Sequence, residues 1–280
     1  MKVLACVACE SGAGPQLAFA AIVRSIEPDA ALTLLHVLPR GGDAAAAEEC
    51  LSDAQAKIAP VPSETKVRRG DPSSQILDEI REGAFDLVIL GPNEAPGLRR
   101  HFLGSVTTQV VRRAPCSVVV AQQARSTLTH VLICSGGTDL AEDVIKTGAW
   151  IARAVAARAT LLHVVTPVPS MYTGLGELEE SLSELLQTDT PVARHLRRGA
   201  RILEQQGVSA ELRLRYGVVA DEIIREAREA NSDLILVGAV KGRPKLKRLM
   251  LGEVTQQVVE RSPRSVLVVR GALGHDLGEV

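Results

Sequence analysis

Asp86-Leu87-Val88-Ile89-Leu90-Gly91 and Asp233-Leu234-Ile235-Leu236-Val237-Gly238 are two versions of one apolar run, and their repetition decides the fold. The two closing glycines stand 238 − 91 = 147 positions apart. A second pair of matching segments, 104–115 and 252–263, repeats at 252 − 104 = 148 positions, and each segment runs from a glycine to a proline. Self-similarity at this spacing indicates two whole domains rather than a solenoid of short repeats.

The length of the chain agrees with this duplication. It has 280 residues, and a domain usually takes roughly 100 to 200. We predict one domain over 1–123, a second over 128–270 and a loose tail over 271–280, with 122–128 as a polar linker. Each half is long enough to bury a core of its own.

The composition describes an aliphatic chain without strong charge. Hydrophobic residues make up 46% and aromatic residues only 2%, as expected for buried parallel strands under alanine-rich helices. The formal net charge of −1 favours neither nucleic acid nor an anionic membrane. Val3-Leu4-Ala5-Cys6 resembles a lipoprotein cleavage box, but too few residues precede it for a signal peptide. We therefore expect a cytoplasmic protein with no membrane partner.

Five cysteines are scattered over both halves. An odd number fits a reducing compartment better than a disulfide framework. Cys6 and Cys9 form a C-x-x-C pair, but their spacing on a strand end points them to opposite faces, and no second pair completes a zinc site. We expect the cysteines to be small buried hydrophobes, with a redox pair as the alternative.

Short β-branched runs alternate with helical periodicity, which predicts β-α-β units and parallel sheets covered on both faces. In the first half we expect strands at 2–8, 31–38, 65–69, 85–91 and 117–121, and helices at 15–26, 44–58, 73–82 and 105–113. The second half repeats this order between 130–134 and 265–269, but its segment 166–190 is longer. We expect a helix within 177–186, and two roles stay open for the segment: a flap over the strand ends or a surface insertion without ligand contact.

The loop after the fourth strand is the predicted site. Ligands of open α/β sheets bind at the carboxyl ends of the strands, near the switch point of the strand order. In the first half this loop, 91–105, has a glycine at each end and leads into a helix that begins at Ser105. Backbone N–H groups and the positive helix end can hold an anion there. A strand end and a helix cap without any ligand explain the same local pattern equally well.

Both halves resemble universal stress protein domains. The resemblance rests on an apolar strand ending in glycine, a loop close to G-x2-G-x9-G-[ST], a helix, a proline and a Val-rich closing strand. Supporting segments are Leu35-His36-Val37, Leu162-His163-Val164, Gly70-Asp71-Pro72 and Gly217. The resemblance implies an α/β fold with two doubly wound five-stranded parallel sheets, related to each other by a pseudo-two-fold axis. In each sheet the implied strand order is 3-2-1-4-5, as in adenine nucleotide alpha hydrolase-like proteins. It also implies ATP as the candidate ligand, because some members bind ATP in this loop and others lack the motif.

The nucleotide motif is incomplete in both halves. Glu94 stands at the second glycine of the first loop and would bring a carboxylate near the phosphates. In the second half Gly242 comes one residue late, and Glu253 replaces the hydroxyl at the helix start, where it competes with a phosphate.

The aspartate that contacts adenine in the family is also missing. Ala8 or Cys9 takes its place in the first half and Gly136 in the second. The nucleotide contacts that the resemblance still implies are Val37, Leu90, Gly91, Gly104, Ser105, Val106, Val164, Val237, Gly238, Gly242 and Gly252. No catalytic or metal-ligating residue is predicted, and no cofactor other than ATP.

Two further features receive structural explanations. His36 and His163 repeat at equivalent strand ends with no carboxylate or cysteine pattern nearby, so we expect them to be structural. The second loop is basic, and such a run can hold a phosphate but is more often a solvated face; it contains Lys241, Arg243, Lys245, Lys247 and Arg248. Without interleaved aromatic residues, nucleic acid is disfavoured as a partner.

One alternative belongs to a different functional class. Segment 135–140, Ser-Gly-Gly-Thr-Asp-Leu, resembles the S-G-G-x-D-S loop of ATP pyrophosphatases, which adenylate a substrate, but Leu140 replaces the final serine. We predict instead a tandem universal stress protein that binds or regulates in the stress response without catalysis. An ATP-binding protein that uses the first-half loop is the nearest alternative, and the protein partner and a homodimer stay open.

Overall fold

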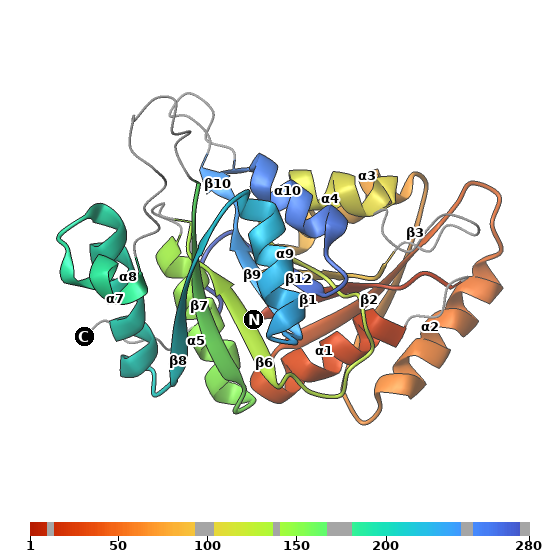
Figure 1. The fold of residues 1–280 in the computed structure, drawn as a ribbon. Coiled ribbons are helices and arrows are strands. Elements are labelled where there is room, and N and C mark those ends of the chain that lie inside the picture. Colours follow the sequence, from red (N-terminus) through yellow and green to blue (C-terminus); the bar gives the residue numbers. More distant parts are fainter. Residues whose placement is uncertain (10–13, 93–103, 137–140, 167–180, 242–248, 275–280) are drawn as a thin grey trace.

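The computed structural model describes residues 1–9, 14–92, 104–136, 141–166, 181–241 and 249–274 of the chain (Figure 1). In the first half strands and helices alternate along the chain as predicted. They are β1 (Lys2–Cys6), α1 (Gly14–Ile26), β2 (Ala31–Leu38), α2 (Ala44–Ile58), β3 (Glu64–Arg69), α3 (Pro72–Gly83), β4 (Leu87–Leu90), α4 (Ser105–Arg113) and β5 (Ser117–Val120). The bounds of β2, α2 and α4 are those expected from the sequence, and the other ends differ by one or two residues.

The second half repeats the order with additions after its second and fourth strands. It contains β6 (His130–Cys134), α5 (Ala141–Ala154), β7 (Arg158–Val165), α7 (Leu182–Gln187), α8 (Pro191–Gln205), β8 (Ala210–Tyr216), α9 (Val219–Glu229), β9 (Leu234–Gly238), β10 (Val240–Lys241), β11 (Leu249–Met250), α10 (Glu253–Arg261) and β12 (Ser265–Val269). The short strands β10 and β11 pair antiparallel, so a hairpin stem stands where we expected only a polar loop.

A single ten-stranded sheet joins the two halves, in the order β3-β2-β1-β4-β5-β12-β9-β6-β7-β8. Each half therefore has the predicted order 3-2-1-4-5, and within each half the strands are parallel. β5 and β12 pair antiparallel, which places the halves edge to edge about a pseudo-two-fold axis. Two hydrogen bonds repeat across this seam at 3.1 Å, from Gln122 N to Ser265 Oγ and from Arg270 N to Ser117 Oγ.

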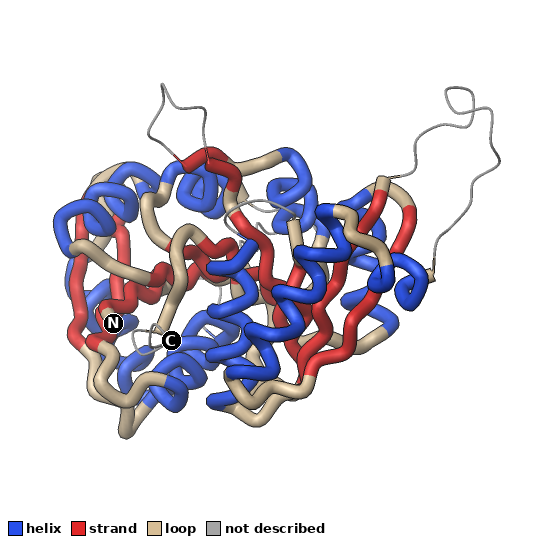
Figure 2. Tube along the Cα trace, turned by 90° about the vertical axis from the view of Figure 1, so that its left-hand side faces the viewer, coloured by secondary structure: helices blue, strands red, loops and turns tan. Residues whose placement is uncertain are grey.

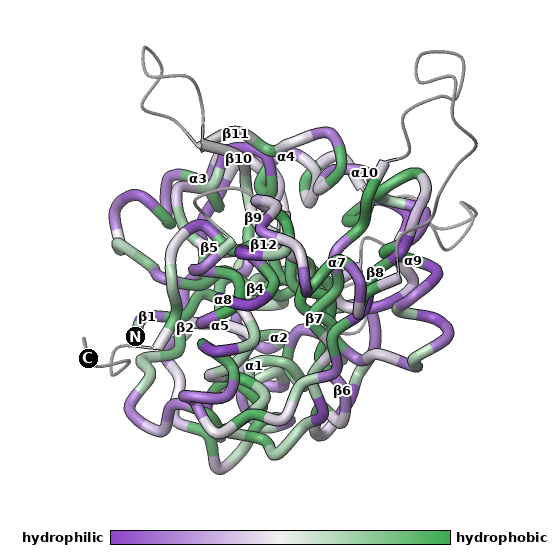
Figure 3. The backbone as a smooth tube through the Cα atoms, turned by 60° about the vertical axis from the view of Figure 1, so that its left-hand side comes forward, coloured by the Kyte–Doolittle hydropathy of each residue, from purple (hydrophilic) through white to green (hydrophobic). Residues whose placement is uncertain are grey.

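Helices cover both faces of the sheet (Figure 2). One hydrophobic cluster lies under α1, α2, α5 and α8, and the other lies under α3, α4, α9 and α10. Each cluster contains residues of both halves, so the two halves share their core layers. The antiparallel seam continues the sheet, and the apolar strands in the interior therefore form one continuous layer (Figure 3).

The insertion of the second half is visible in the numbering of the repeat. The two strand-end histidines are 163 − 36 = 127 positions apart, whereas the glycines after β3 and β8 are 217 − 70 = 147 apart. The helix expected within 177–186 is α7, which begins at Leu182 and buries Leu185 in the cluster beneath α8. The described part of the insertion thus packs as a surface addition on α8, and 167–180, where a flap was considered, lies outside the described residues.

The last described residues are not a loose tail. Leu273 is 6% exposed and its N–H donates to Thr147 Oγ1 at 3.1 Å, while Gly274 abuts the ring of Trp150. These contacts fix 271–274 against α5, so the prediction of a loose tail is wrong there. Residues 275–280 lie outside the described part of the chain.

Several helices begin where a side chain caps them. Asp71 accepts a hydrogen bond from Ser74 N at 2.9 Å before α3, and Thr190 accepts one from Ala193 N at 3.2 Å before α8. By contrast, Gly104 and Gly252, which cap α4 and α10, supply no side-chain acceptor. The N–H groups in the first turns of α4 and α10 are therefore not satisfied by a capping side chain.

Candidate functional site

The switch point of the first half lies between β1 and β4. These strands are neighbours in the sheet, but β1 leads into α1 on one face and β4 leads into α4 on the other. In doubly wound sheets, connections that diverge in this way leave a ligand-binding crevice at the carboxyl ends of the strands, so we place the candidate site here. The second half repeats the arrangement with β6 and β9.

The first residues of α4 belong to the helix that follows β4 in the chain. Gly104 is the N-cap with an extended backbone, and Ser105 is exposed as the first helical residue. Val106 is half-buried and packs against the cluster beneath α4. An exposed hydroxyl beside open backbone N–H groups at a helix start can donate to an anionic group.

Gln16 on α1 lies beside the end of β4, and sequence reasoning missed it. Its side chain is 3% exposed and lies against Gly91, where a Cβ would come within 2.5 Å of Gln16 Oε1. That oxygen is buried and accepts no hydrogen bond from the residues that the structure describes. Gly91 therefore has a packing role of its own, because a side chain there would collide with the buried Gln16 amide.

This contact predicts the effect of Gly91→Ala. The added methyl must displace the buried Gln16 amide, and overpacking of this kind costs about 1–2 kcal/mol. Chemical denaturation should show this loss, and the additional variant Gln16→Ala should recover most of it. An unchanged unfolding free energy in Gly91→Ala would mean that Gly91 is not held by packing.

The other residues implied by the resemblance lie at the strand ends, in two different environments. Leu90 and Val237 are 3% and 4% exposed within the core, so a ligand could meet only their backbone. Val37 and Val164 are half-buried at the ends of β2 and β7, with partly accessible side chains. Apolar contact with a ligand is therefore available at the two valines.

In the second half, side chains of the protein occupy the corresponding strand end and helix start. Gly238 ends β9, and its carbonyl accepts a hydrogen bond from Thr255 Oγ1 at 2.9 Å. Gly252 caps α10, whose first residue is the exposed Glu253. The Glu253 carboxylate accepts from Gln257 Nε2 at 3.3 Å and places a negative charge at the helix end that a phosphate would need.

The two strand-end histidines hold the backbone in place. His36 Nδ1 donates to the carbonyl of Val7 at 2.8 Å, and His163 Nδ1 donates to the carbonyl of Ser135 at 3.1 Å. Burial lowers the pKa of His163, and the nearby His195 lowers it further, so its ring is neutral at neutral pH. These contacts agree with the predicted structural role.

The cysteine prediction is wrong for Cys9. Cys9 is exposed and forms a disulfide with Cys50 of α2, with a Cα–Cα distance of 5.8 Å. Cys6 is half-buried against the opposite cluster, and Cys134 is buried, as expected for small hydrophobes. The two residues of the C-x-x-C point to opposite faces, and this leaves Cys9 free to meet a helix of the other layer.

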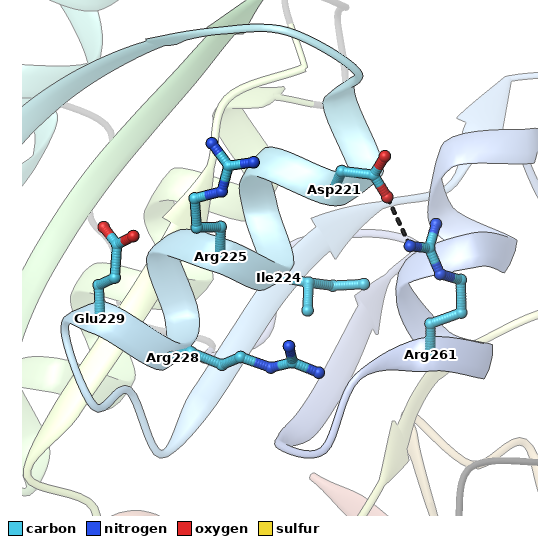
Figure 4. Close-up of a pocket in the computed structure, with 6 residues that line it drawn as sticks. All are labelled: Asp221, Ile224, Arg225, Arg228, Glu229 and Arg261. Atoms are coloured by element: carbon cyan, nitrogen blue, oxygen red, sulfur yellow. Dashed lines mark hydrogen bonds and ion pairs between the residues drawn. The ribbon is translucent and has the colours of Figure 1, made fainter.

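A pocket of about 390 Å³ opens between α9 and α10 (Figure 4). Its lining comes from these two helices alone: Asp221, Ile224, Arg225, Arg228, Glu229 and Arg261. Most of its charges are paired, since Asp221 binds Arg261, Arg225 binds Glu222 and Glu229 binds Arg215. It offers no strand-end backbone to a phosphate, so the crevice beside α4 is the better candidate.

Comparison with known proteins decides the family. The model of the universal stress protein family matches this chain twice, over residues 40–122 and 127–270. This chain belongs to the universal stress protein family. The double match and the repeated strand order show that it is a tandem universal stress protein.

Individual relatives are distant. Universal stress protein Slr1230 of Synechocystis is 25% identical over 195 residues, which cover 69% of this chain and 61% of the relative. Universal stress protein MJ0531 of Methanocaldococcus jannaschii is 29% identical over 140 residues, covering 50% and 81%. This tandem universal stress protein thus spans about three fifths of the length of the Synechocystis relative.

Solved structures match almost the whole chain. The functionally unknown protein PA1789 of Pseudomonas aeruginosa superposes with a TM-score of 0.72 at 20% identity, covering 96% of this chain and 92% of that one. A universal stress protein of Archaeoglobus fulgidus gives a TM-score of 0.67 at 16% identity, covering 97% and 96%. At these identities the likeness shows the fold alone.

Parts of the predicted site lie outside the described residues. They are Glu94, Gly242, the basic residues 243–248 and the segment 137–140 of the pyrophosphatase-like loop. Within the described part of the chain, no group of three or more His, Cys, Asp or Glu side chains could hold a metal ion. No helix among the same residues is long and apolar enough to cross a membrane.

Proposed function

We propose that this tandem universal stress protein is a non-catalytic binding module of the stress response that takes an adenine nucleotide in its first half only. The observation that carries the proposal is the difference between two equivalent helix starts. Each helix follows an N-cap glycine that supplies no capping side chain. The first helical residue is the exposed Ser105 in α4 and Glu253 in α10. An anion is favoured at the first start and repelled at the second.

Two further observations support a ligand in the first half. Val37 offers an apolar surface at the neighbouring strand end. The resemblance supplies the ligand class, since some family members bind ATP in this loop. Because the motif is incomplete, we expect the binding to be weak.

An adenylating enzyme that uses 135–139 is less well supported. Ser135 is 6% exposed, its carbonyl binds the His163 ring, and its hydroxyl lies 3.5 Å from the same ring nitrogen. A hydroxyl in this position is turned toward the protein rather than toward a substrate. Release of pyrophosphate from ATP by the purified protein would revive the enzymatic alternative.

The proposal predicts opposite effects at the two helix starts. Ser105→Glu should weaken ATP binding by at least about ten-fold, because like charges about 4 Å apart repel by roughly 4 kcal/mol at an effective dielectric constant of 20. Glu253→Ser removes the equivalent charge and should leave first-half binding unchanged or add a second weak site. Isothermal titration calorimetry with ATP measures both effects.

Ser105→Ala is the matched control, because it removes the hydroxyl without adding charge. Loss of one hydrogen bond should weaken binding only about five-fold, or about 1 kcal/mol. The proposal fails if wild-type protein at millimolar ATP gives neither calorimetric heat nor a rise in melting temperature. It also fails if Ser105→Glu binds ATP as well as the wild type does.

A further inference from the structure

The Cys9–Cys50 disulfide connects the segment after β1 to the middle of α2. Cys9 follows the end of β1 and is exposed, whereas Cys50 is half-buried against the core of its layer. Their Cα–Cα distance of 5.8 Å is ordinary for a disulfide, so the fold itself brings the two sulfurs within bonding reach. In a cytoplasmic protein such a bond forms only transiently, since cellular thiols reduce it.

His36 stands beside Cys9 in an orientation suited to proton transfer. Its Nδ1 lies 2.8 Å from the Val7 carbonyl and must carry the ring proton, because a carbonyl can only accept. Nε2 is then the nitrogen that can accept a proton, and it lies 3.7 Å from Cys9 Sγ, whereas the proton-bearing Nδ1 lies 3.2 Å from the same sulfur. When the disulfide is open, His36 can take the proton of the Cys9 thiol.

The other three cysteines are poor competitors for an oxidant. Burial raises the pKa of Cys6 to about 12, and the nearby Glu79 charge raises it further. Burial raises the pKa of Cys116 to about 12 as well, and it raises that of Cys134. Because the thiolate is the reactive species, oxidation should begin at Cys9.

We propose that Cys9 and Cys50 form a reversible oxidation site that reduces a hydroperoxide, with Cys9 as the attacking thiol and Cys50 as the resolving thiol. The Cys9 proton passes to His36, and the sulfur attacks the terminal peroxide oxygen. The O–O bond breaks, and the departing oxygen leaves as an alcohol or water after taking a proton. Cys9 is now a sulfenic acid.

The second step closes the disulfide. The Cys50 sulfur attacks the Cys9 sulfur, the S–O bond breaks, and water leaves with the proton of the Cys50 thiol. Two thiols have lost two electrons and two protons, and the hydroperoxide has gained both. A small dithiol reduces the disulfide by two thiol–disulfide exchanges. Each round of oxidation and reduction of the cysteine pair therefore consumes one hydroperoxide.

Oxidation should also act on ligand binding, a consequence that rests on the proposed function. Cys9 is one of the two residues at the place of the family's base-contacting aspartate. In the disulfide its sulfur is tied to α2, 3.2 Å from His36 Nδ1, and has no S–H to donate. Reduced protein should therefore bind ATP about five-fold more tightly than oxidised protein, the effect of one hydrogen bond.

Thiol counting after treatment with hydrogen peroxide tests the redox site without any nucleotide. Full-length protein reduced with dithiothreitol, then freed of reductant, should show five thiols, and peroxide should leave 5 − 2 = 3. Cys50→Ser should stop at a Cys9 sulfenic acid that dimedone labels, and the control Cys116→Ser should still lose two thiols.

His36→Asn should slow the reaction about 100-fold near neutral pH. That deficit should shrink as the pH approaches the ordinary thiol pKa of about 8.5, which a merely structural role would not produce.

Several outcomes would overturn the redox proposal. They are a disulfide that dithiothreitol does not open in the folded protein, oxidation that begins at Cys6, Cys116 or Cys134, and the absence of a dimedone adduct in Cys50→Ser. ATP titration of the reduced and oxidised forms separates the two proposals. If neither form binds ATP, the proposed function fails, while the thiol counts still decide the oxidation site.

Discussion

Arg215→Met should destabilise the protein by about 3–5 kcal/mol, the usual cost of leaving buried carboxylates without their cation. Arg215 lies on β8 and contacts three carboxylates of α9, namely Glu222, Glu226 and Glu229. The side chains of Glu226 and Glu222 are 4% and 8% exposed. Glu222 keeps Arg225 as a second partner at 2.9 Å, but Glu226 has no other ion pair within the described residues.

The first half provides a matched control at the equivalent positions. Arg68 contacts Glu79 and Glu82 in the same way, but Lys66 also reaches the buried Glu79 at 2.7 Å. The residue at the place of Lys66 in the second half is Arg213, which pairs with Glu211 instead. Arg68→Met should therefore cost only about 1–2 kcal/mol, because the buried carboxylate keeps a cation.

Chemical denaturation of the two variants under identical conditions gives the comparison. The expected result is a clearly larger loss for Arg215→Met than for Arg68→Met. Equal losses would show that Lys66 does not compensate, and a small loss for Arg215→Met would show that Glu226 becomes neutral or solvated without penalty.

Asp233→Asn should cost about 2–4 kcal/mol, since it weakens several charge-assisted hydrogen bonds in a buried site. Asp233 Oδ2 accepts from Thr129 N at 2.6 Å, Thr129 Oγ1 at 2.7 Å and His130 N at 3.1 Å. Arg125 of the linker lies 2.8 Å from Oδ1. An asparagine would turn its NH₂ group toward either these donors or the guanidinium, and both arrangements repel.

Asp86 is the matched control for this substitution, because 233 − 147 = 86. Its half-buried carboxylate accepts from Lys2 N at 2.7 Å. Asp86→Asn should lose about 1 kcal/mol or less. A comparable loss at both positions would mean that the linker contact and the hydrogen bonds of Thr129 add nothing.

The same carboxylate predicts how stability depends on pH. Burial opposes the charge of Asp233, but the hydrogen bonds from Thr129 and His130 and the nearby Arg125 outweigh it and hold its pKa below the ordinary value. A group whose pKa is lowered by folding stabilises the protein above its unfolded pKa, about 4 for an aspartate, and loses this contribution as the pH falls through the folded value. Wild-type stability should therefore fall more steeply below about pH 4 than that of Asp233→Asn.

The sequence was sufficient for the fold of each half. The buried runs 86–91 and 233–238 and the alternation around them predict parallel strands, and the family resemblance implies their order. The elements β2, α2 and α4 have the predicted bounds. The resemblance implied the pseudo-two-fold relation of the halves. The antiparallel pairing of β5 with β12 was not predicted, because both are short apolar strands with no signal for it. The continuous core follows from that pairing.

The site was predicted in outline only. Gly91 follows β4, and Gly104 and Ser105 begin α4, where the local pattern places them. Gln16 was missed, since a glutamine in a helix carries no signal until the fold sets it against Gly91. The Cys9–Cys50 bond was missed because spacing directs attention to Cys6 and Cys9, although a cysteine after β1 and one on α2 above the neighbouring strand already suggest proximity.

The number of ATP molecules bound per chain tests the central claim most directly, namely that duplication produced two like crevices of which only the first still accepts an anion. Equilibrium dialysis of reduced, full-length protein against labelled ATP should give one molecule per chain and almost none in Ser105→Glu. Two molecules per chain, or one that persists in Ser105→Glu, would contradict the account.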